Sequence, residues 1–128
     1  MILFIDKIDF EVKEKIKLFP LISRSNCVDE LVGGESHKIY AIDTYSKNVV
    51  GYILVNPSIG NLPPEIQFIE VQLKYQKSGI GSSLLEKALD FLRKNKEKRV
   101  SLFPLSGSAN FFLKRNFYKK GLQMFLDL

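Results

Sequence analysis

The feature that most constrains the fold is a short glycine-containing loop between an apolar run and an amphipathic run. Residues 65–73 have the composition of a strand, and residues 82–94 repeat apolar side chains at helical spacing. The loop between them reads Gln76-Lys77-Ser78-Gly79-Ile80-Gly81. The first N–H groups of a helix have no internal partners and carry partial positive charge, so this junction predicts an anion-binding turn. A tight turn without a ligand is the alternative.

The rest of the chain predicts an α/β protein of the α+β type, with a mixed sheet and helices on its faces. Polar Ser46-Lys47-Asn48 between two runs of β-branched and aromatic residues indicates a hairpin. The expected strands are 2–5, 38–42, 49–55, 65–73, 100–103 and 122–126. The expected helices are 10–19, a short one at 28–32, 82–94 and 108–115, with a turn at Gly33-Gly34.

Length and composition favour one domain over residues 1–128. The chain is 45% hydrophobic, and its net charge of +5 favours anionic partners without choosing among them. The apolar start Ile2–Ile5 is followed by Asp6, too short a run for a membrane span or a signal peptide. Cys27 is the one cysteine and His37 the one histidine, so we expect no metal site. These features predict a cytoplasmic protein that does not enter a membrane.

The spacing of the glycines excludes two common nucleotide-binding loops. A Walker loop needs G-x-x-x-x-G-K-[ST], and the sequence contains no such string. A dinucleotide fingerprint needs G-x-G-x-x-G, but Leu84 stands where the third glycine would be. The loop also follows a predicted hairpin rather than a first strand.

Two motifs resemble those of the GCN5-related N-acetyltransferase (GNAT) family. The loop matches the family signature Q/R-x-x-G-x-G/A at Gln76, Gly79 and Gly81. Residues 110–117 align without gaps with the family pattern G-F-Y-E-K-L-G-F, and the clear match spans about 65–117. The resemblance implies a single GNAT domain, a central mixed sheet with splayed fourth and fifth strands, and acetyl-CoA-dependent N-acetyltransfer.

The resemblance also implies a binding site for acetyl-CoA. The strand before the loop would pair through Ile69 and Val71 with the pantetheine arm, as an added strand does. The Val71 amide would donate to the thioester oxygen. Phe111 and Phe112 would pack, one into the core and Phe112 toward the thiol. The pyrophosphate would bind to Gln76, Lys77, Ser78, Gly79, Ile80, Gly81 and Ser82.

Two glutamates are candidates for the base that deprotonates the attacking amine. Glu65 opens the strand at the distance from Gln76 where histone-type members carry their catalytic glutamate. Glu70 lies deeper in the strand, where an ionised carboxylate is costly unless paired or facing a cleft. A solvated strand end and a partner for a lysine are the respective alternatives.

The family's usual general acid is a tyrosine, but this chain has Phe112 at that position. Phenylalanine has no proton to give. The thiolate would then leave unaided or through water, Tyr118 or Tyr75 would substitute, or catalysis would be lost.

Several partners and functions stay open at this point. The acceptor is a small-molecule amine or an amine of a protein or peptide. A catalytically weak or inactive acyl-CoA-binding regulatory module is the alternative to an enzyme. A nucleic-acid module is suggested only by the basic charge, and no aromatic stacking motif supports it. A homodimer is compatible with the sequence.

Overall fold

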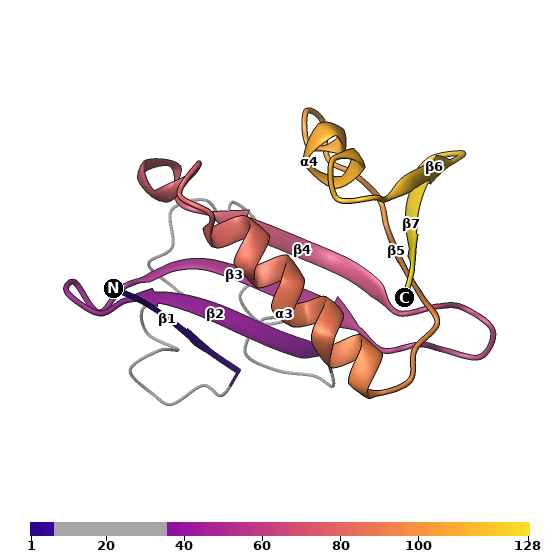
Figure 1. The fold of residues 1–128 in the computed structure, drawn as a ribbon, viewed down its shortest axis with the longest axis horizontal. Helices are drawn as coiled ribbons and strands as arrows, with labels where there is room; N and C mark the ends of the chain where they lie inside the picture. The colour runs from indigo at the N-terminus through magenta and orange to yellow at the C-terminus, as the bar shows by residue number, and fades with distance from the viewer. Residues whose placement is uncertain (7–35) are drawn as a thin grey trace.

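The computed structural model describes residues 1–6 and 36–128, whose strands form one seven-stranded mixed sheet (Figure 1). The strand order is β1-β2-β3-β4-β5-β7-β6, and only β4 and β5 run parallel to each other. This confirms the predicted mixed sheet with flanking helices. The strands are β1 Ile2–Ile5, β2 His37–Asp43, β3 Val49–Asn56, β4 Glu65–Val71, β5 Arg99–Leu102, β6 Tyr118–Lys120 and β7 Gln123–Asp127. The helices are η1 Leu73–Tyr75 (a 3-10 turn), α3 Ile80–Lys94 and α4 Ala109–Leu113.

The first four strands form an antiparallel meander, in which each strand pairs with the next one in the sequence. β2 and β3 are the two arms of the predicted hairpin, and their β-branched and aromatic residues suit a pleated, buried surface. The turn closes with a 3.0 Å hydrogen bond from the Asp43 amide to the Asn48 carbonyl. Lys47 takes a left-handed backbone conformation there, with φ of 60°.

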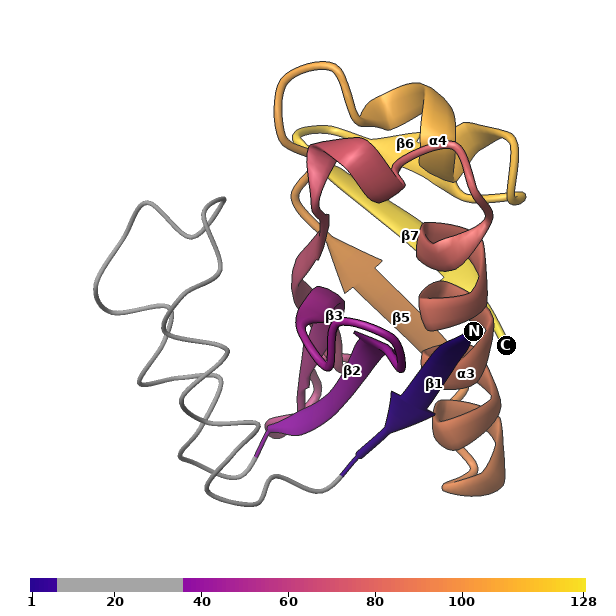
Figure 2. The same cartoon turned by 90° about the vertical axis from the view of Figure 1, so that its left-hand side faces the viewer.

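Helix α3 covers one face of this meander, as Figure 2 shows from the side. Its buried residues recur at helical spacing and face the sheet, as the sequence predicts. Gly51 lies under the helix, where an added Cβ would be 3.1 Å from the Glu70 carbonyl oxygen and 3.3 Å from Leu84. The glycine therefore lets α3 lie close to β3. The helix residues in the core are Ile80, Leu84, Leu85, Ala88, Leu89 and Leu92.

Strands β4 and β5 meet at one end and then separate (Figure 1). Their ladder has a single registered pair, Glu65 with Ser101. Close by, the Ser101 amide donates to the Pro64 carbonyl at 3.0 Å. From Ile66 to Val71, β4 pairs with β3 on its other edge and has no registered partner in β5. The predicted splaying of the fourth and fifth strands is present, and it leaves an open edge of main chain.

The structure adjusts several predicted boundaries and adds one strand. β4 ends at Val71 rather than residue 73, because the chain turns into η1. α3 begins two residues earlier than expected, and α4 is shorter than 108–115. Strand β6 was not predicted, because its three residues Tyr118, Lys119 and Lys120 are exposed and carry no apolar alternation. The expected helices 10–19 and 28–32, the turn at Gly33-Gly34 and Cys27 lie outside the described residues.

No helix within the described ranges is long and apolar enough to cross a membrane.

Candidate active site

The loop before α3 presents main-chain amides at the start of the helix. Gly79 caps the helix with φ of 89°, which is why a glycine is needed there. The first backbone hydrogen bond into the helix is from the Ser83 amide to the Gly79 carbonyl at 3.0 Å. Among the described residues, the amides of Gly79, Ile80, Gly81 and Ser82 therefore donate to no main-chain oxygen. This is a cluster of donors suited to a phosphate.

Lys77 adds positive charge to this loop in a strained conformation. Its φ of 63° is in the left-handed region that favours glycine. The Ser78 hydroxyl donates to the Tyr75 carbonyl and thereby ties the loop to η1. A cation is thus held where the backbone itself would prefer glycine.

The open edge of β4 leads directly into the loop. The Gln72 amide donates to the Val50 carbonyl of β3 at 2.8 Å. Successive N–H groups of an extended strand point to opposite edges, so the Val71 amide points into the gap beside β5, and Ile69 presents its main-chain groups on the same edge. The Gln76 side chain donates to the Val71 carbonyl at 2.9 Å. The strand and the loop therefore share one continuous main-chain surface.

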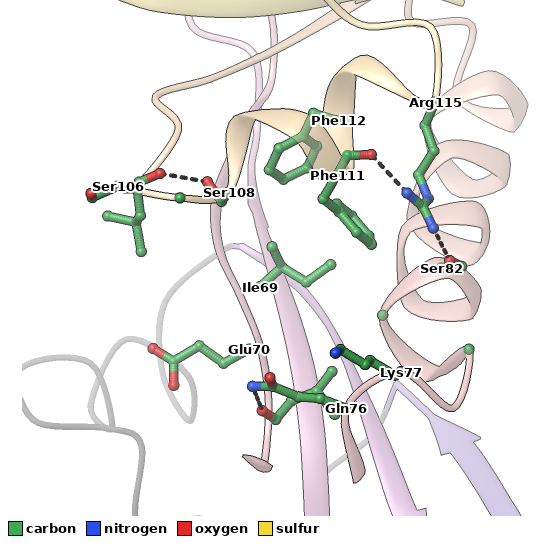
Figure 3. A pocket seen from close by; sticks show the side chains of 15 residues that line it. Ile69, Glu70, Gln76, Lys77, Ser82, Ser106, Ser108, Phe111, Phe112 and Arg115 are labelled. Carbon is green, nitrogen blue, oxygen red and sulfur yellow. Dashed lines mark hydrogen bonds between the residues drawn. The ribbon is translucent and has the colours of Figure 1, made fainter. Parts of the chain in front are cut away.

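A pocket of about 790 Å³ joins this surface to α4 (Figure 3). Such a volume is in the usual range of small-molecule sites. The free amides and Lys77 fit a pyrophosphate, and the unpaired edge of β4 fits an extended amide-containing arm such as pantetheine. The lining residues are Ile69, Glu70, Val71, Gln76, Lys77, Gly79, Gly81, Ser82, Leu105, Ser106, Gly107, Ser108, Phe111, Phe112 and Arg115.

Phenylalanines of α4 form the opposite wall. Phe112 is 3% exposed and makes edge-to-face contacts with Phe111 and Phe117, at centroid distances of 5.1 and 5.3 Å. Phe111 lies next to the start of α3, where a Cβ added to Gly81 would be 3.6 Å from its ring. The family's tyrosine position is therefore occupied by a packed ring at the pocket wall.

The two candidate bases lie at opposite ends of β4. Glu65 pairs with Ser101 at the closed end of the gap and is absent from the pocket lining. Glu70 lines the pocket and is the one acid among its lining residues. Its Oε2 is buried and accepts no hydrogen bond within the described part of the chain. Burial raises the pKa of Glu70, and the Tyr52 hydroxyl, from the paired position on β3, acts in the opposite direction.

Other candidate side chains lie elsewhere. The Tyr75 hydroxyl donates to the Asp43 carboxylate; this bond raises the pKa of Tyr75 and lowers that of Asp43. Tyr118 is on exposed β6, stacked on Phe125. Neither tyrosine lines the pocket. His37 stacks on Phe91 at 3.5 Å between ring centroids, and burial lowers its pKa. Among residues 1–6 and 36–128 no group of three His, Cys, Asp or Glu side chains is placed to hold a metal ion.

Sequence reasoning missed part of the pocket lining. The connector residues Leu105, Ser106, Gly107 and Ser108 form one side, and Arg115 forms another. The connector carried no recognisable motif. Arg115 did leave a signal, because it occupies the leucine position of the G-F-Y-E-K-L-G-F pattern.

A family model described as the acetyltransferase (GNAT) family matches residues 6–120. The chain belongs to the GNAT family. The resemblance suggested by the two sequence motifs is therefore confirmed, and the GNAT match begins far ahead of them, at residue 6, and ends shortly after the second, at residue 120. A search of curated proteins found no match for this GNAT chain.

Solved structures share the GNAT fold at low sequence identity. A GNAT-family protein from Desulfovibrio desulfuricans is 15% identical with a TM-score of 0.81, and the match covers 99% of each chain. A GNAT acetyltransferase from Staphylococcus aureus is 18% identical with a TM-score of 0.74, covering 100% of this chain and 99% of the other. The PaiA N-acetyltransferase of Thermoplasma acidophilum, solved with coenzyme A, is 15% identical with a TM-score of 0.73 and the same coverage. The family and its CoA-bound structural neighbours support acetyl-CoA-dependent acetyl transfer in general terms.

Proposed function

We propose that this protein is an N-acetyltransferase in which a primary amine attacks the thioester of acetyl-CoA directly, in a ternary complex. The observation that carries the proposal is that one pocket is lined by the amide-rich loop, by the open edge of β4 and by Glu70. A binding module needs the first two features, whereas a proton acceptor beside them is what acetyl transfer adds.

Acetyl-CoA supplies the activated acetyl group, and the chain supplies its contacts. The amides of residues 79–82 and the Lys77 ammonium bind the pyrophosphate, aided by Gln76 and Ser78 in shaping the loop. Ile69 and Val71 pair their main-chain groups with the pantetheine arm. The Val71 amide, aimed into the gap, stabilises negative charge on the thioester oxygen, a contribution of about 3 kcal/mol in comparable sites.

Glu70 is the base we favour for the amine. An amine is mostly protonated at neutral pH and must lose a proton before or during attack. The raised pKa of Glu70, caused mainly by burial, brings it closer to the range in which a carboxylate accepts that proton well. Glu65 remains the second candidate, acting through water along the gap.

The departing thiolate receives its proton from water in this proposal. Phe112 has no acidic hydrogen, and neither Tyr75 nor Tyr118 lines the pocket. A thiol has a pKa near 8.5, so its thiolate is a tolerable leaving group without a dedicated acid. We further propose that the protein acts in the cytoplasm on a small-molecule amine or on an amine of a peptide or protein.

The test is an assay of CoA release with acetyl-CoA and a panel of primary amines that includes polyamines, amino sugars and peptides. Wild-type protein should release CoA only when an acceptor is present. Glu70→Gln should lower kcat about 100-fold or more, as loss of a general base does, while CoA affinity stays within twofold. Glu65→Gln is the matched variant and should retain most of the activity. The opposite order of effects would transfer the role to Glu65.

The alternative is a CoA-binding regulatory module without turnover, and Phe112 is the observation that favours it. In that case CoA binds tightly and no amine in the panel promotes CoA release. Absence of CoA binding altogether would reject both functions.

A further inference from the structure

We propose that Arg115 is a second phosphate-binding cation of the pocket, held ready by Phe111 and Ser82 at the start of α3. This inference rests on the proposed binding of acetyl-CoA and concerns a residue that neither family motif assigns.

Arg115 reaches from the end of α4 across to α3. One terminal nitrogen donates to the Phe111 carbonyl at 2.7 Å, and the other donates to the Ser82 hydroxyl (Figure 3). The guanidinium carbon lies 3.8 Å from the centre of the Phe111 ring. Two hydrogen bonds and a stacked ring fix the planar group in one orientation, so little side-chain entropy is left to lose on binding.

The fixed guanidinium has capacity left for a ligand. A guanidinium has more N–H donors than the two bonds use, and within the described residues Arg115 has no carboxylate partner. It also lines the pocket. A half-buried cation without a counter-charge is costly to maintain, and an anionic ligand would remove that cost.

The position of Ser82 connects this cation with the phosphate loop. Ser82 is in the first turn of α3, and its amide is one of the donors that make no main-chain hydrogen bond. Its hydroxyl accepts from Arg115 and can still donate its own proton to a ligand oxygen. Lys77, in the loop before the helix, also lines the pocket, and in Figure 3 Ser82 lies between it and Arg115. A pyrophosphate on the loop would therefore lie between a flexible lysine and a fixed arginine.

The same contacts allow a purely structural reading, in which Arg115 only ties α4 to α3. The two readings differ in what they predict for ligands without phosphate. A structural tie affects all ligands and the folded state, whereas a phosphate-binding cation affects only the phosphorylated ones.

The experiment measures binding of CoA, dephospho-CoA and pantetheine by calorimetry to the wild type and three variants. Arg115→Gln removes the charge and keeps a hydrogen-bonding side chain. Arg115→Lys keeps the charge and loses the planar fork. Lys114→Gln is the matched control, because it removes the neighbouring, exposed cation that does not line the pocket.

We expect Arg115→Gln to weaken CoA binding about 10- to 100-fold and Arg115→Lys to weaken it less. Lys114→Gln should change the affinity for CoA less than about twofold. Pantetheine should bind Arg115→Gln as it binds wild type. An equal loss with dephospho-CoA assigns the contact to the pyrophosphate, and a smaller loss assigns it to the 3′-phosphate. CoA binding unchanged in Arg115→Gln, or a parallel loss of pantetheine binding, overturns the inference. Wild-type protein that fails to bind CoA would instead reject the proposed function.

Discussion

The two sides of the pocket are built in different ways. The loop side presents main-chain N–H groups from one continuous stretch, residues 79–82, at the start of a long helix. The rest of the lining depends on single side chains from separate segments, namely Glu70 of β4, Phe112 of α4 and Arg115 just after α4. Main-chain donors are present whatever the side chains are, provided that the backbone can take the required shape. Ligand binding by the loop side should therefore tolerate side-chain substitutions but not a change of backbone conformation. Binding by the other side should depend on the side chains themselves.

The largest effect should follow a bulky charge on the loop side. Gly79→Glu and Gly81→Glu should each abolish CoA binding, because the added carboxylate fills and repels a phosphate site. Calorimetry with CoA measures this. Gly81→Ala is the matched control, since its Cβ would make only ordinary contacts at 3.6 Å. Retention of near-normal affinity by both glutamate variants would mean that the loop holds no phosphate.

The second effect is the pH dependence of activity and stability that Glu70 causes. Burial raises the pKa of Glu70, so kcat/KM should fall on the acid side at a pH above the ordinary pKa of a glutamate. The unfolded chain releases this proton at lower pH than the folded chain. The stability that protonated Glu70 contributes is therefore complete below the unfolded pKa and is lost as pH rises through the folded pKa.

Glu70→Gln is neutral at every pH and escapes that loss. Its free energy of unfolding, relative to wild type, should increase as pH rises from about 4 to 7. Urea titrations at a series of pH values measure the difference. A difference that is flat with pH would show that Glu70 has no raised pKa. Glu65→Gln is the comparison variant for the same titrations.

A smaller effect is expected from Lys77, which contributes both a side-chain charge and a left-handed backbone conformation to the loop. Lys77→Ala should weaken CoA binding only several-fold, because the amides remain. Lys77→Gly removes the same charge but suits the φ of 63°, so it should raise the free energy of unfolding by about 1 kcal/mol relative to Lys77→Ala. Equal stability of the two variants would argue that the left-handed conformation is not maintained in solution.

The smallest effect should come from restoring the family's tyrosine. Phe112→Tyr should change kcat less than about twofold if water already protonates the thiolate. A larger rise would reveal that the missing acid limits the reaction, and thermal unfolding would show whether the buried hydroxyl is tolerated.

The contrast between the two sides also explains what the sequence could predict. The hexapeptide around Gly79 is contiguous, and its chemistry depends on a local strand-to-helix turn. Its position in the fold could therefore be predicted from the sequence. The contact between Arg115 and Ser82 joins residues 33 positions apart and exists only after α4 has packed on α3. Likewise, β6 depends on its pairing with β7 rather than on any apolar pattern of its own.

Glu65 and Glu70 illustrate the same limit within one strand. Sequence spacing made both of them candidates, yet it could not say where along the splayed gap each would lie. That depends on the single pairing of β4 with β5, which is a property of the whole sheet.

The interrupted pairing of β4 and β5 also bears on how the protein behaves before it meets a ligand. Unpaired main-chain groups on a strand edge are a template for strands of other chains, and so for self-association. In this fold the template lies inside the sheet, in a wedge closed at one end by the pair of Glu65 and Ser101. Occupancy by a ligand arm and pairing with another polypeptide would compete for the same hydrogen bonds. Filling the pocket would thus protect the chain from aggregation as well as prepare it for chemistry.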